Sequence, residues 1–288
     1  MFKTILVAAS GTDDDAAAYA AALAIARPFA AHIDALHVKL DAVTTAVAMT
    51  TDAGSGALTA GLIDRLEQDA RERETKAHDS FTRFCNSTGL ASSERPPPPT
   101  AAAPSAEWHV ETGEEPRWMA EYGTTADLIV ARRGSGEDVL ARSTLEAVLL
   151  ETGRPILIPA AAPIPATFER IAIAWKPTPQ AARATAFAMP FLTRAKDVVV
   201  VTVEEEAEGQ SDADRLVRNM AWHGISAGTL QLKPGPQGAA AALLPGVAGR
   251  ADLLVMGGYG HSRLREWVFG GFTQIVLADA GLPVLLAH

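Results

Sequence analysis

The fold is decided by a short stretch that the chain contains twice, first as Ala126-Asp127-Leu128-Ile129-Val130 and again as Ala251-Asp252-Leu253-Leu254-Val255. A second pair of similar stretches follows these copies, Pro155-Ile156-Leu157-Ile158 and Pro283-Val284-Leu285-Leu286. Two related stretches in the same order, far apart in one chain, indicate that a whole structural unit is repeated. We therefore analyse the chain as two copies of one fold.

The starts of the two copies also match, because Ile5-Leu6-Val7-Ala8 and Ile171-Ala172-Ile173-Ala174 each precede an alanine-rich segment. The first copy is longer, and its extra residues lie within about 41–105. Leucines and phenylalanines at helical spacing predict a long charged helix over 57–84 in this insertion. The run Pro96-Pro97-Pro98-Pro99 after it predicts a surface loop. The expected domains are 1–160 and 166–288, with a Pro/Ala linker over 159–165 between them.

Short apolar runs alternate with alanine-rich helical segments in both copies. These runs are continuously apolar, as strands of a parallel sheet covered on both faces require. The sequence predicts an α/β fold of two tandem doubly wound domains, each with a five-stranded parallel sheet. One copy alone would leave an open sheet edge, so we expect the copies to pack together through 155–159 and 283–287 as an internal pseudo-dimer. The predicted strands are 5–9, 34–38, 108–112, 128–131, 156–159, 171–175, 198–203, 228–232, 253–256 and 284–287.

Composition excludes several classes of protein. The 288 residues are 48% hydrophobic and 20% charged, which is ordinary for a globular protein. The formal net charge of −9 disfavours binding to nucleic acid or to an anionic membrane surface. The longest aliphatic run, 198–201, is far shorter than the roughly 20 residues that span a bilayer. The single cysteine, Cys85, leaves no intramolecular disulfide, so we expect a cytoplasmic location.

The clearest candidate site is the glycine-rich segment 256–273, which follows the second copy of the repeated stretch. In a doubly wound sheet, ligands bind at the carboxyl ends of the strands. Backbone amides beside Gly257 and Gly260 are suited to hold phosphate oxygens, and Gly270 and Gly271 open a helix whose first amides attract anions. Two tight turns around a surface segment are an equally good explanation of the glycines alone.

The spacing Gly257-x2-Gly260-x9-Gly270 resembles the nucleotide-binding signature of the universal stress protein family, and the resemblance covers nearly the whole chain. It implies an adenine nucleotide alpha hydrolase-like fold, a role in stress response and signalling without catalysis, and ATP, with Mg²⁺, as the candidate cofactor. An unknown protein partner and a homodimer are further expectations. The cofactor-binding residues that the resemblance implies are Trp175, Lys176, Val203, Gly257, Gly260, His261, Ser262, Gly270, Gly271, Phe272 and Thr273.

Departures from the family pattern predict that nucleotide binding is weak and that it occurs in the second copy only. Lys176 stands where the first strand often ends in Asp, so it has no acceptor for adenine. Gly271 stands where a Ser or Thr is usual, which leaves Thr273 as the nearest hydroxyl. In the first copy Arg132 replaces the first glycine, so we expect no ordinary nucleotide site there.

Other readings of the sequence have less support. Ser10-Gly11-Thr12-Asp13 faintly resembles the pyrophosphate loop of adenylating enzymes, but no catalytic partners are visible. A nucleotide-free protein–protein interaction module of the same fold is the main alternative. The histidines are scattered, none is expected in a carboxylate cluster, and no metal site is predicted. Trp118, Met119 and Trp222 are expected in the core.

Overall fold

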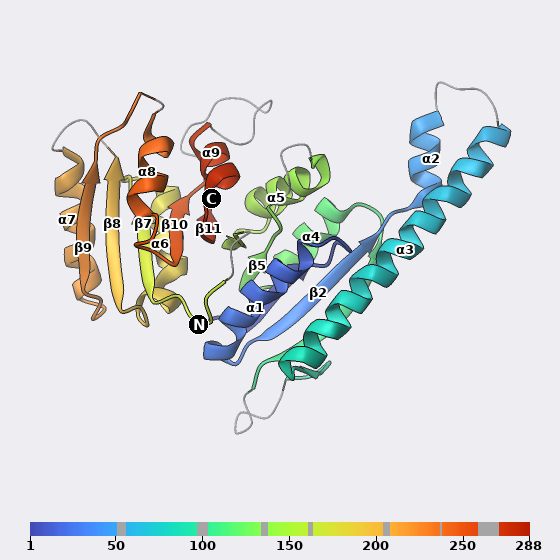
Figure 1. Cartoon of the computed structure of the whole chain (residues 1–288), viewed down its shortest axis with the longest axis horizontal. Coiled ribbons are helices and arrows are strands. Elements are labelled where there is room, and N and C mark those ends of the chain that lie inside the picture. Colours follow the sequence, from blue (N-terminus) through green and yellow to red (C-terminus); the bar gives the residue numbers. More distant parts are fainter. Residues whose placement is uncertain are drawn as a thin grey trace.

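The computed structural model describes residues 1–50, 56–96, 103–133, 138–160, 164–203, 208–236, 238–258 and 271–288. In these residues a single twisted β-sheet runs through the molecule, and helices cover both of its faces (Figure 1). The strand order is β3-β4-β2-β1-β5-β6-β11-β10-β7-β8-β9. The strands are β1 (Thr4–Ala8), β2 (His32–Lys39), β3 (Ala91–Ser92), β4 (Ser105–Thr112), β5 (Leu128–Val130), β6 (Ile156–Ile158), β7 (Arg170–Ala174), β8 (Asp197–Val203), β9 (Ala227–Leu232), β10 (Leu253–Gly257) and β11 (Val284–Ala287).

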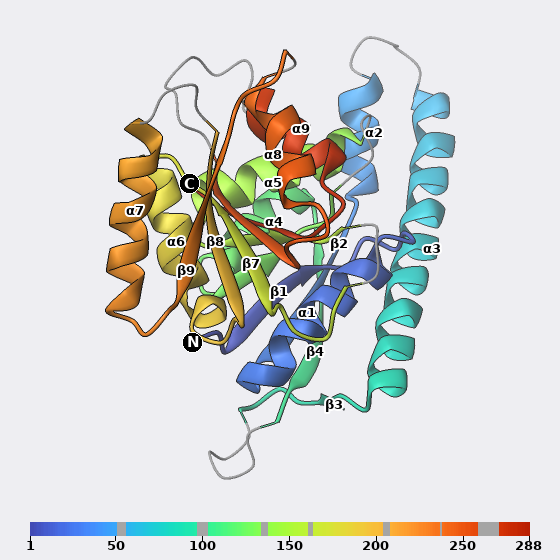
Figure 2. The same cartoon turned by 60° about the vertical axis from the view of Figure 1, so that its left-hand side comes forward.

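The two faces of the sheet carry separate hydrophobic cores. Alternate residues of a strand point to opposite faces, so Ile5 and Val7 join one core and Leu6 and Ala8 join the other. The first face is covered by α1 (Asp15–Phe29), α3 (Gly56–Thr88), α6 (Pro179–Leu192) and α7 (Glu208–Ala221). The second is covered by α4 (Glu115–Gly123), α5 (Val139–Glu151), α8 (Ala239–Val247) and α9 (Gly271–Asp279). Figure 2 shows the helices on the two sides of the sheet.

The predicted α/β fold class is confirmed, and the two halves of the sheet have the same topology. The first half has the order β4-β2-β1-β5-β6 and the second the order β9-β8-β7-β10-β11. All neighbours within a half are parallel. Each half therefore contains the five parallel strands that the sequence predicts, and the two-residue strand β3 extends the first half beyond that prediction. The domain boundaries at 1–160 and 166–288 stay a prediction.

The two halves join through β6 and β11, which pair in antiparallel register. Ile158 lies opposite Val284, and Ile156 lies opposite Leu286. This pairing confirms the expected contact between 155–159 and 283–287. Because the joining strands are antiparallel, the strands of the two halves run in opposite directions. The carboxyl ends of the first half consequently lie at the opposite edge of the sheet from those of the second.

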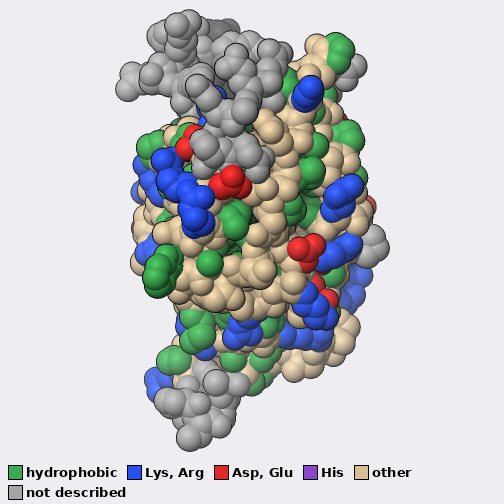
Figure 3. Space-filling view, turned by 90° about the vertical axis from the view of Figure 1, so that its left-hand side faces the viewer, with side chains coloured by type: hydrophobic (Ala, Val, Ile, Leu, Met, Phe, Trp, Pro, Cys, Tyr) green, Lys and Arg blue, Asp and Glu red, His purple; other side chains and the backbone are tan. Residues whose placement is uncertain are grey.

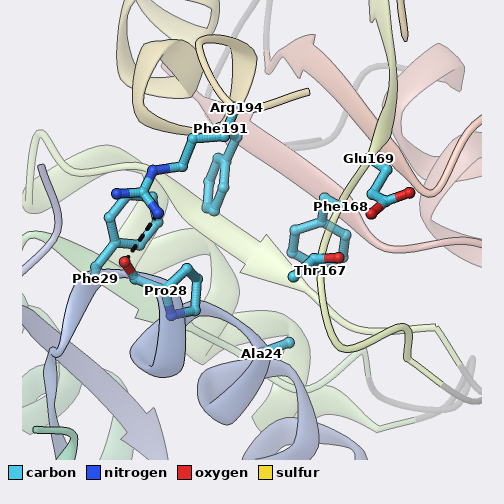
Figure 4. Close-up of a pocket in the computed structure, with 8 residues that line it drawn as sticks. All are labelled: Ala24, Pro28, Phe29, Thr167, Phe168, Glu169, Phe191 and Arg194. Carbon is cyan, nitrogen blue, oxygen red and sulfur yellow. Dashed lines mark hydrogen bonds between the residues drawn. The ribbon is translucent and has the colours of Figure 1, made fainter. Parts of the chain in front are cut away.

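Aromatic side chains reinforce this join on the first face of the sheet. Phe191 of α6 packs against Phe2 and Phe29, with ring centroids 4.9 and 5.9 Å apart, and against Phe168 at 5.7 Å. Arg194 covers the cluster, because its guanidinium lies 4.6 Å from the centroid of Phe29 and donates to the carbonyl of Pro28 at 2.9 Å (Figure 4). A hollow of about 180 Å³ remains between α1 and α6. We interpret it as a feature of the join between the halves.

The inserted region of the first half consists mainly of one long helix. Helix α3 spans Gly56–Thr88, close to the predicted 57–84, and α2 (Ala42–Thr50), which the sequence analysis did not identify, packs against it. The proline run lies partly outside the described residues. One core prediction is wrong: Met119 is fully buried, but Trp222 is 89% exposed at the end of α7. Spacing alone did not show which face of α7 meets the sheet.

Candidate functional site

The ends of three neighbouring strands meet at the carboxyl edge of the second half. β7 pairs with both β8 and β10, so their last residues, Ala174, Val203 and Gly257, end at the same edge. Trp175 and Lys176 follow β7 directly, and the Trp175 amide donates to the carbonyl of Val201 at 2.8 Å. Trp175 is half-buried and Lys176 is exposed. The structure thus brings together the predicted residues Trp175, Lys176, Val203 and Gly257.

The glycine pair at the end of β10 has a packing role of its own. A Cβ atom on Gly257 would lie 2.5 Å from the backbone nitrogen of Ala181, at the N-terminus of α6. The Gly258 amide donates to the carbonyl of Ala287 at 2.8 Å, and a Cβ on Gly258 would meet Leu149 of the other half at 3.3 Å. These contacts require a residue without a side chain at position 257, whatever the site binds.

The far end of the glycine-rich segment is the start of α9, which begins at Gly271 as the sequence predicts for a helix there. Thr273 is buried at 4% exposure, and Phe272 is 36% exposed. The other predicted ligands of this segment, Gly260, His261, Ser262 and Gly270, lie outside the described residues. The role of all these residues in binding stays a prediction.

Two buried polar groups near this edge have no hydrogen-bond partner among the described residues. They are Nε1 of Trp175 and Oγ1 of Thr202. A buried donor without a partner costs about 1–3 kcal/mol, so such groups need an explanation. Sequence reasoning included Trp175 but missed Thr202, which follows four consecutive valines in β8 and precedes a fifth. A hydroxyl within this run of valines was the signal that could have identified it.

At the carboxyl ends of the strands in the first half, the backbone amides after β1 are already hydrogen-bonded within the protein. The carboxylate of Asp15, which is only 1% exposed, accepts hydrogen bonds from the amides of Ser10 and Gly11, both at 2.8 Å. Gly11 has a φ of +74° and a Cβ there would lie 2.6 Å from the carbonyl oxygen of Arg73 in α3. The amides after β1 are therefore engaged, and the inserted helix packs over them.

Arg132 occupies the position of the first glycine in this half. It is 6% exposed and forms an ion pair with Asp138, which also caps α5 by accepting from the Ala141 amide at 2.9 Å. Glu115 lies nearby. Burial raises its pKa, and the charge of Arg132 opposes that rise. In the first half, the buried Arg132 and the partly buried Asp138 thus form an ion pair where the second half has the first glycine of its loop.

Comparison with solved structures finds the same architecture in universal stress proteins. The chain is similar to a universal stress protein from Archaeoglobus fulgidus DSM 4304, with a TM-score of 0.66, 16% sequence identity, and coverage of 99% of this chain and 95% of that one. A putative universal stress protein from Pseudomonas aeruginosa UCBPP-PA14 gives a TM-score of 0.55 at 16% identity, covering 99% of this chain and 93% of that one. The chain has the fold of universal stress proteins.

A third solved structure, a functionally unknown protein from Pseudomonas aeruginosa PAO1, matches with a TM-score of 0.56 at 16% identity, covering 99% of this chain and 92% of that one. No protein-family model matches the sequence, and no curated protein matches it. The universal stress protein fold therefore extends over nearly the whole chain.

Figure 3 shows one side of the molecule, the side that carries α7 and β9. Lys and Arg side chains are scattered over this side among hydrophobic ones, with fewer Asp and Glu side chains between them. Among the described residues, none of the helices combines the length and the hydropathy needed to cross a membrane.

The expectation that no histidine joins a carboxylate cluster is wrong. His32 and Asp34 of β2 lie beside Glu107 and His109 of β4, and all four side chains are about one quarter exposed. Burial raises the pKa of Asp34, but hydrogen bonds from His109 and His32 outweigh it, and the pKa lies well below its usual range. The hydrogen bond to Asp34 raises the pKa of His109. The alternation His-x-Asp and Glu-x-His was visible in the sequence, but the register that joins the two pairs was not.

Proposed function

We propose that this protein is a tandem universal stress protein that binds an adenine nucleotide in its second half, with ATP and Mg²⁺ as candidate ligands, and that it acts in stress response or signalling without catalysis. One observation carries the proposal. The ends of β7, β8 and β10 meet at the edge from which the segment Gly257-x2-Gly260-x9-Gly270 departs. Ligands of open α/β sheets bind at this edge.

The unpartnered groups support the same location. Trp175 provides an aromatic ring and an indole N–H at the end of β7, and Thr202 provides a hydroxyl near the end of β8. An adenine ring offers a flat face and nitrogen acceptors, which suit such a pair. We propose that a bound nucleotide satisfies these two groups after local adjustment of the side chains around them.

The difference between the halves supports one nucleotide per chain. In the first half, the Asp15 carboxylate accepts hydrogen bonds from the amides of Ser10 and Gly11. Arg132, at the position of the first glycine of the loop, forms an ion pair with Asp138. A polyphosphate there would compete with buried carboxylates of its own charge. In the second half Ala181 stands at the position of Asp15, and Gly257 stands at the position of Arg132.

We expect the affinity to be about micromolar or weaker. Charge-assisted hydrogen bonds from backbone amides contribute about 1.5–3 kcal/mol each. A few of them, less the cost of association, correspond to roughly −8 kcal/mol. Lys176 provides no acceptor for adenine, Gly271 provides no hydroxyl, and a net charge of −9 gives no long-range attraction for a polyanion.

The test is calorimetric titration of the purified protein with ATP and Mg²⁺, together with chromatography of any nucleotide that heat releases from it. Gly260→Val should abolish binding, because a side chain there blocks close approach of the phosphates. Gly281→Val is the matched control, since a Cβ at Gly281 meets nothing within 4 Å. Saturable binding that is lost only in the Gly260 variant would support the proposal.

Three results would contradict all or part of this proposal. Absence of heat at millimolar nucleotide, with nothing released on heating, would favour the nucleotide-free interaction module. Binding that persists in Gly260→Val but disappears when Arg132 is replaced would place the ligand in the first half. Turnover of the bound nucleotide would contradict the non-catalytic part of the proposal.

A further inference from the structure

A polar cluster on the sheet of the first half lies apart from the proposed nucleotide site. It consists of His32, Asp34, Glu107 and His109. In the register of β2 with β4, Asp34 lies directly opposite Glu107, while His32 lies opposite Ser105 and Leu36 opposite His109. The four residues occupy alternate positions, so their side chains share one face of the sheet. This is the face of α4, whose Tyr122 ring lies 5.8 Å from that of His109.

The side-chain atoms of the cluster converge. His32 Nε2 lies 3.3 Å from Oδ1 of Asp34 and 3.8 Å from Oε2 of Glu107. His109 Nε2 lies 3.1 Å from the same oxygen of Asp34 and 3.7 Å from the same oxygen of Glu107. Ligand atoms of His32, Asp34 and Glu107 all lie within 4.8 Å of one another.

The nitrogen–oxygen distances are close to those of a tetrahedral metal centre. Zinc binds histidine nitrogen and carboxylate oxygen at about 2.0–2.2 Å, which places neighbouring ligand atoms of a tetrahedron about 3.4 Å apart. The four nitrogen–oxygen distances of the cluster scatter on both sides of that value. His109 falls outside the group of ligand atoms that all lie within 4.8 Å of one another, so its ring would have to move toward His32 to complete the centre.

The charges of the cluster also call for a cation. Asp34 and Glu107 are register partners on neighbouring parallel strands, and their carboxylate oxygens lie within 4.8 Å of each other, so two negative charges there repel. Among the described residues, the ion pairs formed by these two carboxylates involve the two histidines and no lysine or arginine. A divalent cation held by two carboxylates and two neutral imidazoles gives a site without net charge.

A second layer of contacts orients one of the ligands. Nδ1 of His32 lies 2.8 Å from Oγ of the buried Ser105, which leaves Nε2 directed at the carboxylates. Metal-binding histidines commonly have such a partner on the other ring nitrogen, because it fixes the tautomer and the orientation of the ring. Side chains that are one quarter exposed leave the centre accessible from solvent.

We propose that His32, Asp34, Glu107 and His109 form a binding site for one divalent transition-metal ion, with zinc as the best match. Two imidazoles favour zinc and its neighbours over Mg²⁺ and Ca²⁺, which prefer oxygen ligands. The site holds β2 to β4 near their amino ends, at the opposite edge from the carboxyl ends of these strands. It is independent of the nucleotide site in the second half.

The test uses full-length protein without a histidine tag, stripped of metal with EDTA and titrated with Zn²⁺ by calorimetry. We expect one zinc ion per chain, bound with micromolar or tighter affinity. His32→Ala and His109→Ala should each weaken binding at least tenfold, while His223→Ala, which removes an exposed histidine outside the cluster, should leave it unchanged. Ser105→Ala keeps all four ligands and should weaken binding about 10–100-fold, because it removes only the orienting contact.

A second measurement separates coordination from folding. Cobalt(II) bound by four ligands in a tetrahedron gives an intense visible absorption, which we expect in the wild type and not in His109→Ala. Asp34→Asn preserves the shape of the side chain but removes its charge. It therefore tests whether Asp34 coordinates the metal even if an alanine variant has a lowered melting temperature without metal. Zinc affinity that is unchanged in the double variant His32→Ala/His109→Ala would overturn the proposal. Equal affinity for Mg²⁺ and Zn²⁺ would overturn the assignment to a transition metal.

Discussion

Gly257 serves the packing of the second half independently of any ligand. Its Cα faces the N-terminus of α6, where an added Cβ would lie 2.5 Å from the nitrogen of Ala181 and 2.7 Å from the carbonyl carbon of Gln180. Both atoms belong to the backbone, so neither can rotate away. A loss of nucleotide binding in a Gly257 variant therefore has two causes, and Gly260 is the better position for testing phosphate contact.

This contact leads to a prediction at the residue scale. Gly257→Ala should lower the free energy of unfolding by about 1–3 kcal/mol, because overpacking against fixed backbone forces β10 and α6 apart. Gly281→Ala is the matched control and should have little effect, since its Cβ meets nothing within 4 Å. Urea unfolding followed by circular dichroism measures both. If the Gly257 variant were as stable as the wild type, α6 would be able to move away from β10 at little cost, and the prediction would be wrong.

Residue identity and spacing predicted one candidate site and missed the other for a physical reason. The glycine-rich segment is continuous in sequence, so its position after a strand could be predicted directly. The cluster of His32, Asp34, Glu107 and His109 depends on the pairing of two strands separated by the whole insertion. A shift of one residue in that register would send two of its members to the other face of the sheet.

Helix α3 is the element that distinguishes the first half from the second. Its buried side packs on β2 and β4 through Phe81, which is 6% exposed and contacts Trp108 at 5.4 Å and Tyr19 at 6.1 Å between ring centroids. Phe84 stacks on Tyr19 at 4.9 Å. The helical spacing of Phe81 and Phe84 predicted this helix, whereas the alanine-rich α2, with a weaker pattern, was not identified.

Removing one aromatic anchor should loosen α3. Phe81→Ala should lower the free energy of unfolding by about 3–5 kcal/mol, as large-to-small changes in a core do. Hydrogen exchange measured by mass spectrometry should show faster exchange over α3 and unchanged exchange over α6. Trp222→Ala, on a residue that is 89% exposed, should change neither stability nor exchange. Unchanged exchange of α3 in Phe81→Ala would mean that its other contacts suffice to hold it.

At the scale of the whole molecule, the two halves share one continuous sheet. The pairing of β6 with β11 and a cluster of aromatic side chains hold them together. The contact between 155–159 and 283–287 was predicted because the copies repeat and each leaves an open sheet edge, whereas the antiparallel register of β6 with β11 comes from the structure. The aromatic cluster between the halves could not be predicted, because its members are far apart in sequence and belong to no repeated motif. These members are Phe2, Phe29, Phe168 and Phe191. On the other face, Arg133 of the first half donates to the carbonyl of Ala280 at the end of α9, at 2.6 Å.

These contacts predict that the halves unfold together. Hydrogen exchange along a urea series should give the same midpoint for β1 and β2 in the first half as for β7 and β8 in the second. Phe191→Ala removes the ring that contacts Phe2 and Phe29, so it should separate the two midpoints. Leu243→Ala is the control. Leu243 is a fully buried residue of α8 on the other face of the sheet, so its truncation should lower both midpoints together. Different midpoints in the wild type would show that the continuous sheet does not couple the halves.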